Sequence, residues 1–311
     1  MVANLRTGVR MKILVAYIAT AGGRDAVALG ATLAGTFGAE LEICVVLPPE
    51  PDNPTEEVER LSDTLDATAQ GWLDEAAALV HDGIPTTTSV AVHANPAGGL
   101  IERAEDVDAG LLVIGGSGGG IVGRHTLGTV VNDILHSSPV PVALAPLGFS
   151  HTGPERIGRL STALGMRPGA GHLVDTIVDF CQAGKVPLRL VSLVALDDMD
   201  HHRGRGIDDA VAHARTHIDK ATGEISARLP ETVPVTSAVV EGDSIEEAVA
   251  GIDWADDDVI VVGVGLVGRP GLPGGEQGRL ARGVVIHDGA QDLGLQDRPG
   301  PPVALGDGDE I

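Results

Sequence analysis

Short apolar runs alternate along this chain with longer segments in which apolar residues recur at helical spacing. The runs predict strands at residues 12–19, 41–47, 86–92, 111–114 and 140–145. The longer segments predict helices at residues 24–37, 54–81, 96–104 and 130–135. Uninterrupted apolar runs are typical of parallel strands that are covered on both faces. The order of these elements therefore predicts a parallel α/β sandwich.

The same pattern begins again after a segment rich in Gly and Pro. Strands are predicted at residues 156–164, 187–196, 233–240 and 259–262. Helices are predicted at residues 171–183, 207–229 and 244–252. The chain therefore reads as a tandem pair of doubly wound parallel-sheet domains. We place the first domain at residues 1–147, a linker at 148–155 and a second, divergent domain at 156–266.

The second domain departs from the first at its end. Where a further helix and strand are expected, residues 267–311 contain repeated Gly and Pro and little apolar periodicity. Such a composition does not readily form packed elements. We therefore predict that the second domain is incomplete at its C-terminus and that residues 267–311 form a disordered tail. An altered reading frame in the gene would also explain the composition of this segment.

The charge and the cysteine content of the chain indicate which partners and which cellular compartment to expect. The 311 residues carry 44 acids against 21 bases, a net charge of −23, which disfavours nucleic acid and anionic membranes as partners. Cys44 and Cys181 lie in separate apolar segments and are expected to be free thiols in a reducing compartment. Basic residues before the run at 12–19 resemble a short signal peptide, yet the same run is needed as the first strand. We expect a cytoplasmic protein.

A glycine-rich segment at residues 115–129 follows the fourth predicted strand and precedes a helix. Glycines let a backbone approach a ligand closely, and free N–H groups at a helix start attract anions. Thr129 could cap that helix or turn its hydroxyl to a phosphate. The segment lacks the Lys of a phosphate-binding P-loop, and its G-x-G-x-x-G match follows the fourth strand of the domain, whereas the dinucleotide motif follows the first.

The spacing of these glycines resembles a known loop. Gly115-x-x-Gly118, nine further residues and Gly128-Thr129 are similar to the G-x-x-G-x9-G-[S/T] loop of the universal stress protein family, and residues 132–142 look like that family's last helix, turn and final strand. The resemblance implies Rossmann-like domains of the adenine-nucleotide alpha hydrolase type, which often occur in tandem. It implies ATP, alone or with Mg²⁺, held at Gly115, Gly118, Gly128 and Thr129, with the backbone of Val45 meeting adenine.

One departure leaves two functions open. Ile18 stands where nucleotide-binding stress proteins usually carry an Asp that contacts the nucleotide. One expectation is a stress-response or regulatory protein that binds ATP without obligatory catalysis, with weak hydrolysis left open. The other is an interaction module that binds no nucleotide and associates with itself or a related domain through the strand at 140–145. The resemblance implies such pairing, and an open strand edge favours it on physical grounds.

Two further sets of residues resemble known chemical sites. Gly22 to Asp25 match the centre of the S-G-G-x-D-S loop of ATP pyrophosphatases, but alanines replace both serines, so this enzyme is a weaker alternative. Acids and histidines at 197–202 contain metal-binding side chains, yet adjacent residues rarely converge on one ion. No catalytic residue and no metal site are predicted.

Overall fold

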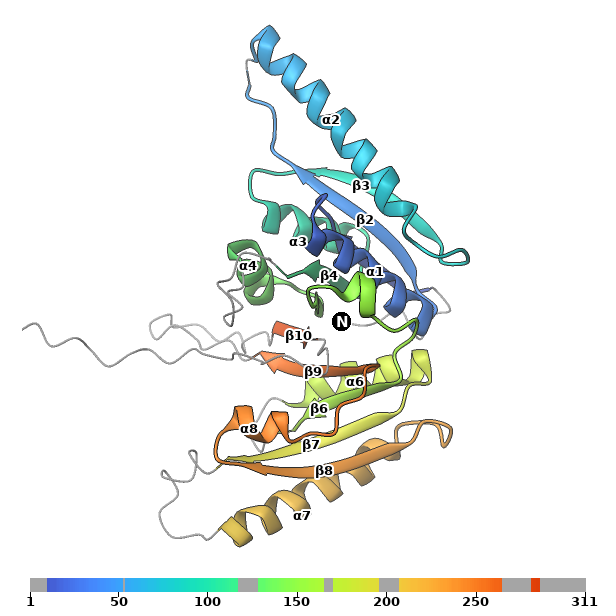
Figure 1. The fold of residues 1–311 in the computed structure, drawn as a ribbon, viewed down its shortest axis with the longest axis vertical. Coiled ribbons are helices and arrows are strands. Elements are labelled where there is room, and N and C mark those ends of the chain that lie inside the picture. The colour runs from blue at the N-terminus through green and yellow to red at the C-terminus, as the bar shows by residue number, and fades with distance from the viewer. Residues whose placement is uncertain are drawn as a thin grey trace, which may run out of the picture.

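The strands of the two domains form one continuous sheet in the computed structural model (Figure 1). The structure describes residues 10–52, 54–116, 128–164, 170–195, 207–264 and 281–285. Over these residues the sheet has ten strands in the order β3-β2-β1-β4-β5-β10-β9-β6-β7-β8. Neighbouring strands are parallel except β9 and β10, which are antiparallel. The prediction of two doubly wound parallel α/β domains is confirmed.

The first domain follows the predicted alternation with small shifts at the element ends. Its elements are β1 (Lys12–Ala16), α1 (Ala21–Phe37), β2 (Glu40–Leu47), α2 (Glu56–Ala77), β3 (Thr86–Val92), α3 (Pro96–Asp106), β4 (Leu111–Gly115), α4 (Thr129–Ser137) and β5 (Val142–Ala145). Helix α1 begins three residues earlier than predicted because Thr20 accepts a hydrogen bond from Gly23 N and so caps it.

The second domain repeats this plan as far as its fourth strand. A short helix, α5 (Phe149–Thr152), precedes it. Its own elements are β6 (Arg159–Ala163), α6 (Ala170–Gly184), β7 (Leu188–Ala195), α7 (Ile207–Ser226), β8 (Val235–Gly242), α8 (Ile245–Ala250) and β9 (Asp258–Val264). A last strand, β10 (Ala281–Val285), follows after a gap in the described residues. The fifth strand of the first domain, β5, is parallel to its neighbour β4, whereas β10 is antiparallel to its neighbour β9.

The duplication extends to individual hydrogen bonds. In the first domain the Thr87 hydroxyl donates to the Leu41 carbonyl at 3.5 Å, and in the second the Thr236 hydroxyl donates to the Leu188 carbonyl at 3.3 Å. The two carbonyls hold equivalent places in the second strand of each domain, since Leu41 pairs with the first strand one residue from its start and Leu188 does the same.

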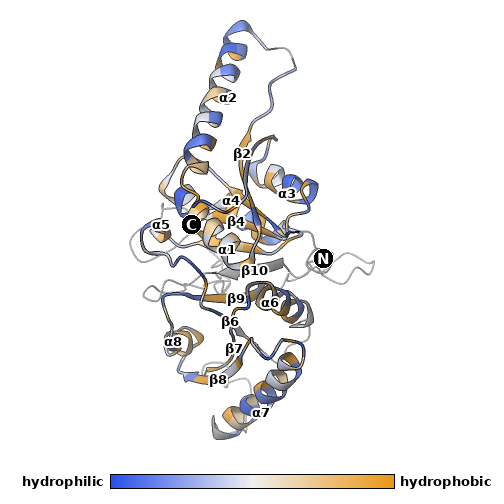
Figure 2. Ribbon diagram, turned by 90° about the vertical axis from the view of Figure 1, so that its right-hand side faces the viewer, coloured by the Kyte–Doolittle hydropathy of each residue, from blue (hydrophilic) through white to orange (hydrophobic). Residues whose placement is uncertain are grey.

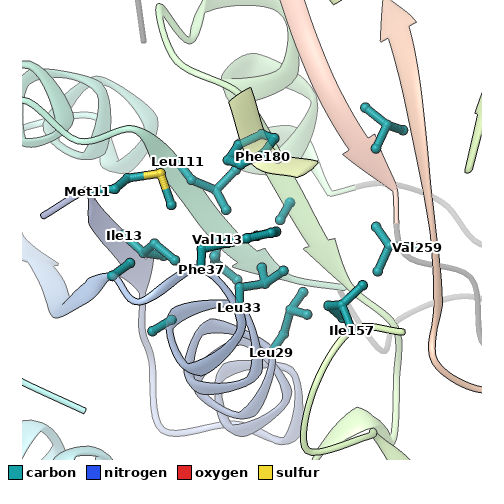
Figure 3. Packing of buried hydrophobic residues seen from close by; sticks show 14 of the residues in the cluster. Met11, Ile13, Leu29, Leu33, Phe37, Leu111, Val113, Ile157, Phe180 and Val259 are labelled. Carbon is teal, nitrogen blue, oxygen red and sulfur yellow. The ribbon is translucent and has the colours of Figure 1, made fainter. Parts of the chain in front are cut away.

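Helices cover both faces of the sheet. Helices α2, α1, α6 and α7 lie on one face, and α3, α4 and α8 lie on the other (Figure 1). The larger apolar core runs beneath the first group and contains residues of both domains (Figure 3). At its centre the rings of Phe37 and Phe180 stack with centroids 5.1 Å apart. Polar contacts accompany this packing, since Ile157 N donates to Thr36 Oγ1 at 3.0 Å. The domains therefore share one core.

The predicted linker at 148–155 contains the short helix α5. The carboxylate of Asp25 accepts hydrogen bonds from Gly148 N, Ser150 N and Ser150 Oγ, at 2.8, 2.9 and 2.6 Å. Phe149 is buried in the shared core. A buried acceptor and an apolar anchor thus hold this segment against α1, and neither is visible as a periodic pattern.

The predicted tail at 267–311 contains the strand β10 at residues 281–285. The remainder of that segment lies outside the described residues. β10 pairs with β5 and with β9, because both strands offer an open edge where the two domains meet. The expected association of the strand at 140–145 with a second copy or a related domain stays a prediction as far as another chain is concerned. β5 has β4 on one side and β10 on the other.

Candidate functional site

The loops after β1 and β4 leave the sheet at neighbouring positions and in opposite directions. β1 and β4 are adjacent, β2 lies beyond β1, and β5 lies beyond β4. The chain passes from β1 to α1 on one face and from β4 to α4 on the other (Figure 1). Ligands of doubly wound sheets bind at such a switch point, outside the carboxyl ends of the strands. The candidate site of the first domain is therefore this edge.

Two glycine backbones are in direct contact at the switch point. A Cβ atom added to Gly115 would lie 2.0 Å from the carbonyl oxygen of Gly22, and one added to Gly22 would lie 2.4 Å from that of Gly116. Real Cβ atoms do not approach that closely, so this contact needs glycine at Gly22 and Gly115. Gly116 N donates to Ala145 O at 3.1 Å and so extends the β4–β5 pairing. The predicted ligand contact at Gly115 stays a prediction, and a structural need for glycine explains the residue independently.

The end of β1 presents an apolar side chain to solvent. Tyr17 is buried, and burial together with the negative charge of Glu75 raises its pKa above the usual value despite the opposing charge of Arg24. The next residue, Ile18, is 57% exposed. This is the position at which the resemblance implies an Asp. The edge therefore offers no carboxylate from this position to the hydroxyls of a ligand.

Helix α4 begins without a side-chain cap. Its N-cap is Gly128, with φ −61° and ψ 157°. The carbonyl oxygen of Gly128 accepts the first hydrogen bond of the helix, from Asn132 N at 3.0 Å. Thr129 is the first helical residue and its side chain is exposed. The predicted capping by Thr129 is therefore wrong, because the residue stands one position too late. Gly118, the remaining predicted glycine contact, lies outside the described residues.

The N–H groups of the first turn of α4 are left without partners inside the helix. Thr20, Thr55, Asn95 and Ser244 cap other helices with their side chains. Helices α1 and α4 flank the switch point together. The side chain of Thr20 caps α1, whereas no side chain of the described residues caps α4. An anion at the switch point could therefore use the N–H groups of the first turn of α4.

Val45 lies inside the sheet in β2. It stands opposite Val90 of β3 and its side chain is buried in the larger core. The side chain therefore has a packing role, and the predicted contact of its backbone with adenine stays a prediction. Asp25 is likewise engaged elsewhere, because its 2% exposed carboxylate binds the start of α5. This placement gives no support to an ATP pyrophosphatase, whose resemblance rested on the segment at 22–25.

Two buried carboxylates of the described residues lie toward the opposite end of the strands. Burial raises the pKa of Glu42, but hydrogen bonds from Ser89 and Arg103, with the charges of Arg103 and Lys12, outweigh it and hold the pKa below its usual value. The distances to Ser89 Oγ and Arg103 Nε are 2.8 and 2.7 Å. Lys12 is the first residue of β1. We assign this cluster to the packing of β1, β2, β3 and α3.

The second cluster is centred on Asp258, the first residue of β9. Its Oδ2 accepts from Arg159 Nη2 at 2.6 Å and from Arg189 Nη2 at 2.9 Å. Arg189 also lies 5.0 Å from the ring centroid of Trp254. The hydrogen bond between Arg159 and Asp258 raises the pKa of Arg159, whereas burial lowers the pKa of Arg189. The cluster joins β6, β7 and β9. Its charges lie away from the carboxyl ends of these strands.

The described residues contain neither a metal site nor a membrane-spanning helix. No group of three or more His, Cys, Asp or Glu side chains suited to a metal ion occurs within the described ranges. The acids and histidines at 197–202 lie outside those ranges. Among the helices that the structure describes, none is both long and apolar enough to cross a membrane.

Comparison with known proteins agrees with this geometry. Residues 10–146 match the Universal stress protein family. Universal stress proteins of Mycobacterium bovis and Mycobacterium tuberculosis are each 24% identical over 279 residues, which is 83% of this chain and 91% of the relative. The crystal structure of a universal stress protein from Archaeoglobus fulgidus superposes with a TM-score of 0.50 at 15% identity, over 77% of this chain and 81% of that one. The last likeness concerns the fold alone.

Proposed function

Residues 10–146 belong to the universal stress protein family, and we propose that this first domain binds ATP as a regulatory ligand without obligatory turnover. The observation that carries the proposal is the arrangement at the switch point. There, a glycine contact holds two loops together beside a helix whose first N–H groups lack a cap. Binding would alter the contacts of the protein with other molecules.

The phosphate end of ATP suits the start of α4. N–H groups at a helix N-terminus bind phosphate because they are unpaired and because the helix dipole is positive there. Thr129 and the two residues after it supply these donors. The net charge of −23 opposes an anion at long range, so the local donors must supply the attraction. A hydroxyl at Thr129 adds one more donor.

The ribose end suits the site less well. Ile18 offers an apolar surface in place of a hydrogen-bond acceptor. A sugar hydroxyl that loses water without gaining a partner weakens binding. The affinity for ATP would therefore depend mainly on the phosphates, and adenosine should bind far more weakly than ATP. Ile18→Asp should strengthen adenosine binding because it supplies the missing acceptor.

The decisive variant is Thr129→Pro. Proline is tolerated at the first helical position and lacks an N–H, and Gly128 already has the extended conformation that a following proline requires. Calorimetric titration of ATP into nucleotide-free protein should show one site. Thr129→Pro should weaken that binding by about tenfold or more, since a hydrogen bond to a charged group contributes about 1.5–3 kcal/mol.

Thr129→Val is the matched control, because it removes the hydroxyl and keeps the N–H. A smaller loss with Val than with Pro would assign the main contact to the backbone. Absence of ATP binding by the folded wild-type chain would refute the proposal. Unchanged affinity in Thr129→Pro would show that the phosphates lie elsewhere.

A further inference from the structure

Helix α2 extends well beyond the sheet that its C-terminal half covers (Figures 1 and 2). Its buried residues are Ala69, Leu73 and Ala76, all in the second half of the helix. None of the residues from 56 to 68 is buried. This outer half spans about 20 Å at 1.5 Å per residue. Isolated helices of that length are only marginally stable in water.

The outer half of α2 nevertheless carries an apolar line. Val58, Leu61 and Leu65 are spaced three and four residues apart, and the same line continues into Ala69 and Leu73. Residues at this spacing share one face of a helix. Leu61 is 59% exposed and Leu65 is 39% exposed. The face that packs on the sheet in the inner half is therefore uncovered in the outer half.

The neighbouring edge strand adds two exposed valines. β3 is the outermost strand of the sheet at this end. Val90 stands opposite Val45, and Val92 stands opposite Leu47, whose side chains belong to the core beneath α1 and α2. Val90 is 39% exposed and Val92 is 63% exposed. The sheet thus shows apolar residues on the α2 side, at the carboxyl end near the outer half of the helix.

The charges around this surface are of one sign. The outer half of α2 carries five acids, Glu56, Glu57, Glu59, Asp63 and Asp66, against one base, Arg60. The Arg60 side chain is directed back to the helix, since its Nε donates to Glu56 O at 3.1 Å. A second copy of the same surface would be repelled. A helix with apolar residues at matching spacing and flanking Lys or Arg would be attracted.

We infer that Leu61 and Leu65 of α2, with Val90 and Val92 of β3, form a docking surface for a cationic amphipathic helix of another protein. The apolar line buries against the helix, and the acidic flanks select its charge and orientation. Helix-in-groove recognition uses this combination of spaced apolar anchors and complementary charges. These four residues are distinct from those assigned to the nucleotide at the switch point.

The test uses the full chain and a fluorescein-labelled peptide of about 18 Leu and Lys residues, with Leu at helical spacing, a length sufficient for helix formation on binding. Fluorescence anisotropy at physiological salt should show saturable binding. Leu61→Ser with Leu65→Ser should weaken it at least about tenfold, because each leucine lost from an apolar contact accounts for about that factor. Leu79→Ser is the matched control, an exposed leucine beyond the end of α2.

Three results would overturn the inference. Equal binding of a scrambled peptide of the same composition would show attraction by charge alone. Unchanged affinity in the double serine variant would exclude the leucines. If sedimentation velocity showed a dimer of the wild type and a monomer of the double serine variant, the occupant would be a second copy of the chain. Circular dichroism of both variants should match the wild type because all three leucines are exposed.

Discussion

Replacement of Gly115 by alanine tests the contact on which the switch point is built. In the structure the new Cβ would lie 2.0 Å from Gly22 O, 2.5 Å from Gly22 C and 3.1 Å from Gly22 Cα. Ordinary contact begins near 3.4 Å, so the two backbones must separate by about 1.4 Å, which is 3.4 minus 2.0. Every atom in the clash is main chain, and no side-chain rotation relieves it.

The expected loss is large for a single methyl group. Overpacking costs about 1–3 kcal/mol when side chains can adjust, and we expect the upper end, about 3 kcal/mol, because β4 and the start of α1 must move apart. Gly71→Ala is the control, since Gly71 lies within α2 and a Cβ there meets nothing within 4 Å. That substitution should stabilise the protein by about 0.5–1 kcal/mol through helix propensity.

Urea unfolding followed by tryptophan fluorescence can measure both changes in the first domain. Trp72 lies on α2 and Trp254 in the second domain, so a Trp254→Phe background leaves a reporter of the first domain alone. An unfolding free energy of Gly115→Ala within about 0.5 kcal/mol of the background would refute the reasoning. Loss of stability with retained ATP affinity would show that Gly115 serves the fold and not the ligand.

Three further changes test other parts of the structure. Asp25→Ala removes the acceptor of three hydrogen bonds and should lower the unfolding free energy in urea by about 3 kcal/mol, against about 1 kcal/mol for Ser150→Ala; equal effects would contradict its role in holding α5. The pKa of Glu42 is lowered in the fold, so its stabilisation is present above the unfolded pKa and is lost as pH falls through the folded one. Glu42→Gln should therefore flatten the decline in Tm below about pH 4, and an acid profile parallel to the wild type would disprove this. Truncation after residue 266 removes β10 and opens the edges of β5 and β9, which should cause concentration-dependent association in sedimentation velocity; a monomer at all concentrations would show that these edges need no cover.

The periodicity of the sequence was sufficient for the order of the elements in both domains. Strands of parallel sheets are apolar along their whole length and helices are apolar on one face, so each element carries its own local signal. The second domain was found because the same signals recur after the linker. Capping residues shifted the ends, as at Thr20, where the first turn of α1 contains glycines and lacks a strong apolar pattern.

Contacts between distant residues were decided only by the tertiary structure. The glycine spacing of the sequence singled out Gly115 as a ligand contact. The reason that this position requires glycine is its close approach to Gly22, which lies far away in the sequence. The same holds for Asp25 and Ser150, separated by 125 positions, and for β10, which pairs with strands of both domains. The acidic helix α2 was expected from the sequence, whereas its uncovered outer half was not. Apolar spacing shows which side of an element avoids water, but only the path of the whole chain determines what covers that side.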